Sequence, residues 1–229
     1  MIETVSRALY AAFVSARRRK KTAKETQPRR APAPEARQRD AERSRERLLA
    51  AALDEFSARG FAGARVNAIA ERAGLNPQLI NYYFGGKDGL YRALEQRWLE
   101  QEASLTAADS SLEDLLAAYL QASFADPRMA RLLLWAGLEH DADPGERLPG
   151  SSEEPDDLVD LRRRQADGEI ASELDPALFE LALMGATLAP IALPHVVQRL
   201  TGLDPGDPTF QDRYADQLRR IVRRLGATA

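Results

Sequence analysis

The side chains best suited to binding chemistry in this sequence lie close together, between positions 65 and 87. Gln78 and Asn81 carry amides that can pair at two points with an adenine edge, and Leu79 can touch a thymine methyl group. Nearby side chains can bind phosphate through a hydroxyl group, an amide or a positive charge, namely Arg65, Asn67, Tyr82, Tyr83 and Lys87. With Asn76 and Pro77, which begin the same segment, these residues form the predicted DNA-binding set.

Two short helices joined by a tight turn are expected to position these groups. A helix with one apolar face is predicted over residues 66–73, because apolar side chains recur there at helical spacing, at Val66, Ile69, Ala70 and Ala73. Gly74 suits a left-handed C-cap. Asn76 can then cap a second helix, with Pro77 at its first position, where the missing N–H costs nothing.

The second helix should bury one face and expose the other. Ile80 and Phe84 are expected to face inward, which leaves the amide and tyrosine side chains mostly outward. A helix, a glycine-containing turn and a second helix with a polar outer face are typical of a helix-turn-helix. Two roles stay open at this point, because Leu79 could be surface packing and Tyr83 could belong partly to the core.

Longer helices are expected on both sides of this unit. A helix over residues 41–59 should end at Gly60, with Phe61 packing back on Phe56. After a tight corner at Gly85–Gly86, another helix is predicted over residues 87–105.

Arg65 and Lys87 occupy positions that their side chains do not favour. Arg65 stands where an N-cap serine or threonine would be better, and Lys87 stands at the positive end of a helix dipole. A DNA phosphate beside each residue would explain both positions.

The charge of the chain is unevenly distributed. Residues 1–47 carry 14 Lys/Arg and 6 Asp/Glu, a net of +8, whereas the other 182 residues carry 18 and 29, a net of −11. Prolines and charges in residues 17–41 predict a disordered linker. This basic extension could be a solvated tail, an arm that follows DNA phosphates, a membrane-surface anchor or an organelle-targeting peptide. An arm predicts that removing residues 1–40 lowers the salt dependence of DNA binding.

Other kinds of chemistry have little support in the sequence. There are no cysteines, which excludes disulfides and thiolate metal sites. Glu139, His140, Asp141 and Asp143 could hold a hard metal ion, but a solvated helix end is the simpler interpretation. No phosphate loop, serine elbow or zinc-protease pattern is present. We therefore expect no enzyme activity, no cofactor and no metal. No apolar run reaches the roughly 18 residues of a membrane-spanning helix, so no membrane partner is expected.

Residues 42–102 also resemble a known family. The residues that carry the resemblance include Phe56, Gly60, Ile69–Ala70, Ala73–Gly74–Leu75, Tyr83–Phe84, Lys87 and Leu90. This stretch resembles the DNA-binding domain of the TetR/AcrR family of bacterial transcriptional regulators. It departs from the family pattern at Arg65, at Pro77–Gln78 and at Asn81, on the surface predicted to read bases.

The rest of the chain, residues 103–229, is predicted to be a second helical domain. Its middle helices are expected to line a ligand pocket, with Tyr119, Phe124, Met129, Leu133, Trp135, Leu138 and Met184 as candidates.

Its last two helices are expected to form a dimer contact or to close the protomer's own core, through Ala182, Gly185, Ala189, Leu218, Ile221, Val222 and Leu225. Pro190 and Pro194 should kink or break the helix between them. A loop is predicted over residues 141–157.

Together these observations predict an all-α protein in three parts. Residues 1–41 form a basic extension, residues 42–102 a three-helix helix-turn-helix domain, and residues 103–229 a ligand-binding and dimerisation domain. The resemblance implies a cytoplasmic bacterial homodimer, associated with the nucleoid, that binds a palindromic operator. It also implies a repressor that a small-molecule effector releases from DNA. The alternatives are a transcriptional activator, or a ligand-binding or scaffold dimer without specific DNA recognition.

Overall fold

The computed structural model describes residues 34–105, 110–139 and 156–225, and every regular element in these ranges is a helix. This confirms the predicted all-α class. The helices are α2 (Pro34–Gly63), α3 (Val66–Ala73), α4 (Gln78–Phe84), α5 (Lys87–Leu105), α6 (Leu112–Ala125), α7 (Arg128–Leu138), α8 (Asp156–Ala166), α9 (Pro176–Ala192), α10 (Pro194–Thr201) and α11 (Pro208–Leu225).

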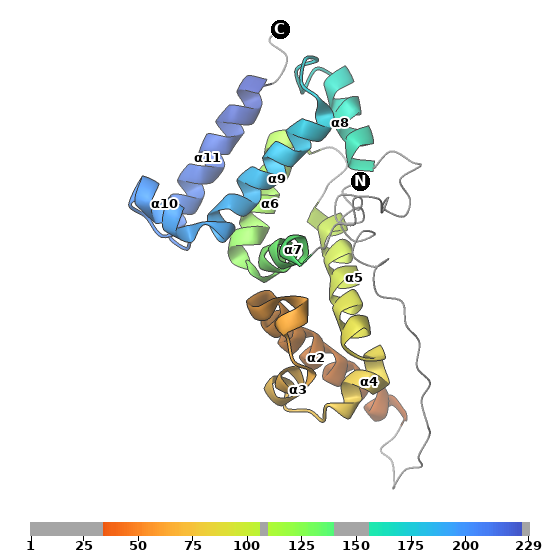
Figure 1. Cartoon of the computed structure of the whole chain (residues 1–229). Coiled ribbons are helices and arrows are strands. Elements are labelled where there is room, and N and C mark those ends of the chain that lie inside the picture. The colour runs from red at the N-terminus through yellow and green to blue at the C-terminus, as the bar shows by residue number, and fades with distance from the viewer. Residues whose placement is uncertain (1–33, 106–109, 140–155, 226–229) are drawn as a thin grey trace.

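The helices form two groups, each with its own core. Figure 1 shows α2, α3 and α4 at one end of the molecule and α6, α8, α9 and α11 at the other, with α5 running between them. The first core is built on α2–α5 and contains fully buried Phe56, Ile69, Ile80 and Leu90. The second core joins α6, α8, α9 and α11, through Leu112, Leu116, Leu120, Leu161, Ile170, Phe179, Leu218 and Val222.

Helix α7 links the two groups. Its Leu132 is 3% exposed and belongs to the first core, although α7 follows α6 in the chain. Arg128, at the start of α7, donates a 2.7 Å hydrogen bond to Asp54 of α2. Helix α7 is therefore held in place by its packing on α2.

Helix α2 begins earlier than the sequence predicted. It starts at Pro34, so the expectation of a disordered linker is wrong for residues 34–41. Proline is tolerated in the first turn of a helix, and the alanine, arginine, glutamate and glutamine that follow have high helix propensity. The predictions for residues 1–33 lie outside the described residues, as does most of the predicted loop over residues 141–157.

The two prolines near the end of α9 have different effects. Pro190 lies inside α9 and is buried, whereas the chain breaks at Leu193, and Pro194 begins α10. The axes of α9 and α10 are bent by 88°. Within the described residues, no single helix is long and apolar enough to cross a membrane; α9 and α10 reach that length only as this bent pair.

Candidate nucleic-acid interface

The turn between α3 and α4 is built as the sequence predicted. Gly74 adopts φ 62° and ψ 38°, in the left-handed region. The N–H groups of Gly74 and Leu75 donate to the carbonyls of Glu71 and Ala70, each at 2.9 Å, which closes a Schellman motif. The Asn76 side chain then accepts the N–H of Gln78 at 2.9 Å, so Asn76 does cap α4.

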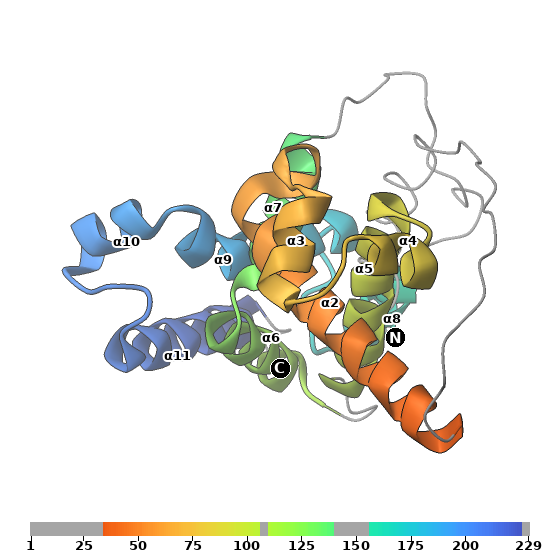
Figure 2. The same ribbon diagram turned by 90° about the horizontal axis from the view of Figure 1, so that it is seen from below.

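Helix α4 presents its polar face to solvent. Ile80 is fully buried, whereas Gln78, Asn81 and Tyr82 are exposed, and Tyr82 keeps 79% of its surface accessible. Asn76 and Pro77 are exposed as well. Figure 2 shows α3 and α4 at the end of the molecule that faces the viewer. The predicted amide pair therefore lies on an uncovered surface.

Two members of the predicted DNA-binding set are partly buried in the first core and partly exposed to solvent. Leu79 and Tyr83 are half-buried and pack against the first core, as the alternative interpretation allowed. The Tyr83 ring lies 5.0 Å from the Tyr82 ring and 6.3 Å from the Phe84 ring. Part of each side chain thus fixes α4 to the domain.

The two residues at the start of α3 are exposed. Arg65 has extended backbone at the N-cap position and makes no capping hydrogen bond through its side chain. Asn67 is exposed one residue into the helix. Neither side chain is covered by another part of the described chain.

Arg45 of α2 supports α4 from behind, a role that the sequence gave no signal for. Its Nη1 donates to the Tyr83 carbonyl at 3.3 Å, and its guanidinium lies 5.0 Å from the Phe84 ring centroid. A positive charge is favourable at a helix C-terminus. The contact joins residues 38 positions apart, beyond the reach of any local pattern.

Lys87 has partners within the chain. Its Nζ lies 4.7 Å from the Phe61 ring centroid and 3.4 Å from the carbonyl oxygen of Ala62. The structure therefore supplies an intramolecular reason for a lysine at the start of α5, and a phosphate is not needed to explain it.

Glu139 and Trp135, at the end of α7, contact α2 on either side of Gly60. The Glu139 carboxylate accepts the N–H groups of Phe61 and Ala62, both at 3.1 Å, and the Trp135 indole N–H donates to the Ser57 carbonyl at 3.2 Å. Gly60 has φ 69°, and a Cβ there would lie 2.2 Å from a Glu139 oxygen. Only glycine fits this close approach.

This contact replaces the predicted metal option for Glu139. His140, Asp141 and Asp143 lie outside the described residues. No group of three or more His, Cys, Asp or Glu side chains within the described part of the chain is placed to hold a metal ion.

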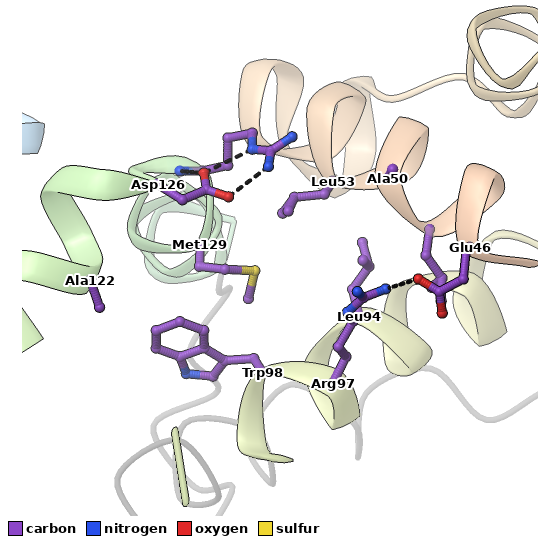
Figure 3. Close-up of a pocket in the computed structure, with 11 residues that line it drawn as sticks. Glu46, Ala50, Leu53, Leu94, Arg97, Trp98, Ala122, Asp126 and Met129 are labelled. Atoms are coloured by element: carbon purple, nitrogen blue, oxygen red, sulfur yellow. Dashed lines mark hydrogen bonds and ion pairs between the residues drawn. The ribbon is translucent and has the colours of Figure 1, made fainter. Parts of the chain in front are cut away.

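A cavity of about 380 Å³ lies where the two groups of helices meet. Its walls come from α2, α5, the end of α6 and the start of α7 (Figure 3). Of the predicted pocket residues, only Met129 lines it.

The other predicted pocket residues lie elsewhere. Leu138 is 78% exposed at the end of α7, so the expectation that it lines a pocket is wrong. Phe124 packs on Phe210, with ring centroids 6.2 Å apart, and Trp135 faces Ser57. Three further candidates, Tyr119, Leu133 and Met184, are half-buried and do not line this cavity.

The predicted dimer residues divide into two kinds. Leu218 and Val222 are 7% and 3% exposed and belong to the protomer's own core, so the expectation that they face a partner is wrong. Leu225 is half-buried against the same core. The remaining four, Ala182, Gly185, Ala189 and Ile221, keep accessible surface.

An apolar stripe runs along the outer face of α9. It consists of exposed Leu178, Leu181, Ala182 and Gly185, and the two leucines keep 68% and 64% of their surface accessible. We call these four residues the α9 stripe. Leu178 and Leu181 are members that the sequence prediction missed.

Both parts of the chain match models of known families. Residues 48–94 match the model of bacterial regulatory proteins of the tetR family, and residues 111–224 match the model of the tetracyclin repressor-like C-terminal domain. The first match contains α3 and α4, and the second contains the α9 stripe and α11.

Individual relatives agree with these matches. The HTH-type transcriptional repressor SCO4008 of Streptomyces coelicolor is 32% identical over 193 residues, which cover 81% of this chain and 98% of the relative. The HTH-type transcriptional regulator RutR of Escherichia coli K12 is 26% identical over 186 residues, 76% of this chain and 86% of RutR.

A solved structure shows the same fold. The putative transcriptional regulator SCO4942 of Streptomyces coelicolor superposes with a TM-score of 0.61 at 23% identity, over 78% of this chain and 97% of that one. The chain therefore belongs to the tetR family of bacterial regulatory proteins and is a DNA-binding transcriptional regulator.

Proposed function

We propose that the protein is a repressor that binds a palindromic operator as a homodimer and leaves it when a small molecule binds. The observation that carries this proposal is the outer face of α4, where two amides and a tyrosine are exposed on a rigidly capped helix. The repressor SCO4008, which matches this chain over 98% of its own length, supports repression over activation.

The proposed division of labour on DNA follows from exposure. Gln78 and Asn81 read base edges, and Leu79 adds an apolar contact from its accessible part. Arg65, Asn67, Tyr82 and Tyr83 contact phosphates and set the register of α4 in the major groove. Lys87 is also assigned a phosphate contact. Its Nζ lies beside the Ala62 carbonyl and the Phe61 ring, which orient the side chain.

The proposed dimer forms through the α9 stripe. Small side chains at Ala182 and Gly185 let two helices approach closely, and Leu178 and Leu181 supply apolar area. A single helix-turn-helix contacts one half-site, so two copies on a twofold axis would read an inverted repeat. A protein that binds an operator on the bacterial chromosome would be located in the cytoplasm.

A gel shift against the DNA that flanks the gene tests this function directly. The full-length protein should retain one fragment when non-specific competitor DNA is in excess. Gln78→Ala should weaken that retention, whereas Gln121→Ala, at an exposed glutamine on α6, should not. Equal retention of all fragments would favour a dimer without specific recognition and would contradict the proposal.

A further inference from the structure

The cavity between the two groups of helices has an apolar interior. Leu53 of α2, Leu94 and Trp98 of α5, and Met129 of α7 line it. Figure 3 shows the Trp98 ring and the Met129 side chain pointing into the same space from opposite helices. Its volume, about 380 Å³, is sufficient for a small organic molecule, since such sites usually span roughly 300–1,000 Å³.

Two arginines stand at this cavity, and they differ in how fully they are paired. Arg128 donates through Nε and Nη2 to Asp126, at 2.8 and 2.6 Å, and through Nη1 to Asp54 at 2.7 Å. Both edges of its guanidinium are therefore occupied. Consistently, the Arg128 side chain lowers the pKa of Asp126.

Arg97 is paired at one nitrogen only. Its Nη1 lies 2.5 Å from Glu46, and its Nε and Nη2 have no hydrogen-bond partner within the described residues. Glu46 is an exposed partner, with 57% of its side chain accessible, so the pair is worth little to stability. Arg97 thus keeps two parallel donors, which is the geometry that a carboxylate or sulfonate binds best.

We propose that this cavity binds a small organic acid with an aromatic or branched apolar body. The body lies between Trp98 and Met129, and the acid group pairs with Arg97. A cation is the weaker fit, because both oxygens of Asp126 are already engaged by Arg128. Of the two carboxylates that line the cavity, only Glu46 keeps an oxygen without a partner among the described residues.

The position of the site suggests how its occupant would act. The cavity is lined on one side by α2 and α5, which carry the helix-turn-helix, and on the other by α6 and α7. A bound molecule would contact both groups of helices and favour one angle between them. This consequence for DNA rests on the proposed function, whereas binding itself does not.

The test uses two fluorescent probes that share one aromatic body. 1-Anilinonaphthalene-8-sulfonate carries an anion, and N-phenyl-1-naphthylamine lacks it. Both should bind the full-length protein saturably. Arg97→Gln should weaken binding of the sulfonate about 10-fold, the effect of losing a charged hydrogen bond, and change binding of the neutral probe less than about 2-fold. Arg131→Gln, an exposed arginine of α7 outside the cavity, is the matched control.

A second variant locates the site. Ala50 is an exposed residue at the cavity, and Ala50→Trp should fill it and abolish binding of both probes, with circular dichroism confirming the fold. Any of three results would overturn the inference: no saturable binding of the sulfonate, equal loss of both probes in Arg97→Gln, or unchanged binding in a folded Ala50→Trp. A gel shift without probe separates the two proposals, because an unmodified full-length protein that retains its DNA fragment but does not bind the sulfonate contradicts this inference alone.

Discussion

Two of the exposed helix faces among the described residues differ in chemistry. The outer face of α4 exposes amides and a tyrosine, whereas the α9 stripe exposes two leucines, an alanine and a glycine. Water satisfies the polar groups of the first face, so this face needs no protein partner and can exchange water for base edges. Water forms no favourable contacts with the apolar second face, so covering α9 with an apolar partner lowers the free energy.

The two faces also differ in how they are held. Helix α4 is short and is fixed by the Asn76 cap, buried Ile80 and the Arg45 contact at its C-terminus. Helix α9 is longer and is fixed by the Asp175 cap, which accepts two N–H groups, and by buried Phe179. A rigid polar face suits recognition of a fixed base pattern, and an apolar face on a long helix suits permanent association.

The largest expected effect comes from charging the apolar face. Leu178→Arg with Leu181→Arg would bury two unpaired charges in the proposed dimer, at a cost of several kcal/mol, and weaken association by about 100-fold or more. Sedimentation velocity should show monomers, and operator affinity should fall with dimerisation. Val159→Arg, an exposed apolar position on α8, is the control. Dimers that persist in the double variant would rule out the α9 stripe as the interface.

Removing an amide from the polar face should affect recognition alone. Gln78→Ala and Asn81→Ala should each lower affinity for the preferred sequence by about 1–3 kcal/mol, because each base contact of this kind is worth that much. Binding to unrelated DNA should not change, since phosphates supply it. Fluorescence anisotropy at fixed salt would measure both. An equal loss on both DNAs would instead mean that these amides contact phosphates.

Glu95, on α5, provides a test based on pH. Burial raises the pKa of Glu95 to about 8, and one of its carboxylate oxygens is buried without a hydrogen-bond partner in the part of the chain that the structure describes. The folded protein therefore holds a proton that the unfolded chain releases near pH 4.5. Its contribution to stability is present at low pH and is lost as pH rises towards 8.

Glu95→Gln should remove this dependence. In urea denaturation, the variant should match the parent near pH 5 and become progressively more stable than it up to pH 8, where the difference levels off. Glu173→Gln, at an exposed position, should give no such trend. A difference that does not vary with pH would contradict burial of the Glu95 carboxyl.

The smallest expected effect is at the contact between α7 and the segment after Gly60. Glu139→Ala leaves the Phe61 and Ala62 N–H groups without their acceptor and should cost about 1–2 kcal/mol of unfolding free energy. Chemical denaturation measures this loss. A stability equal to that of the parent would show that water replaces the carboxylate there.

The helix-turn-helix could be predicted from the sequence because its signals are local. Gly74 and Asn76 set the bounds of α3 and α4 through their own backbone conformation and side chain, and α5 begins and ends at the predicted residues. The contacts of Lys87 and Glu139 could not be predicted, since they join residues 25 and 78 positions apart.

Periodicity was also insufficient for the dimer face. Leu218, Ile221 and Val222 share one apolar stripe in the sequence, yet two of them are buried in the protomer and Ile221 is 43% exposed. A helical pattern shows which residues avoid water, but it does not show whether the same chain or a second copy covers them. The same limit explains the pocket prediction, in which Leu138 is exposed and Phe124 packs on Phe210.

In the proposed mechanism, α4 reads a specific sequence and the α9 stripe pairs two copies to do so. Selection of genomic fragments by the full-length protein tests both parts in one measurement. We expect a single enriched motif made of two inverted half-sites. An enrichment without any common motif, or a motif with one unpaired half-site, would contradict it.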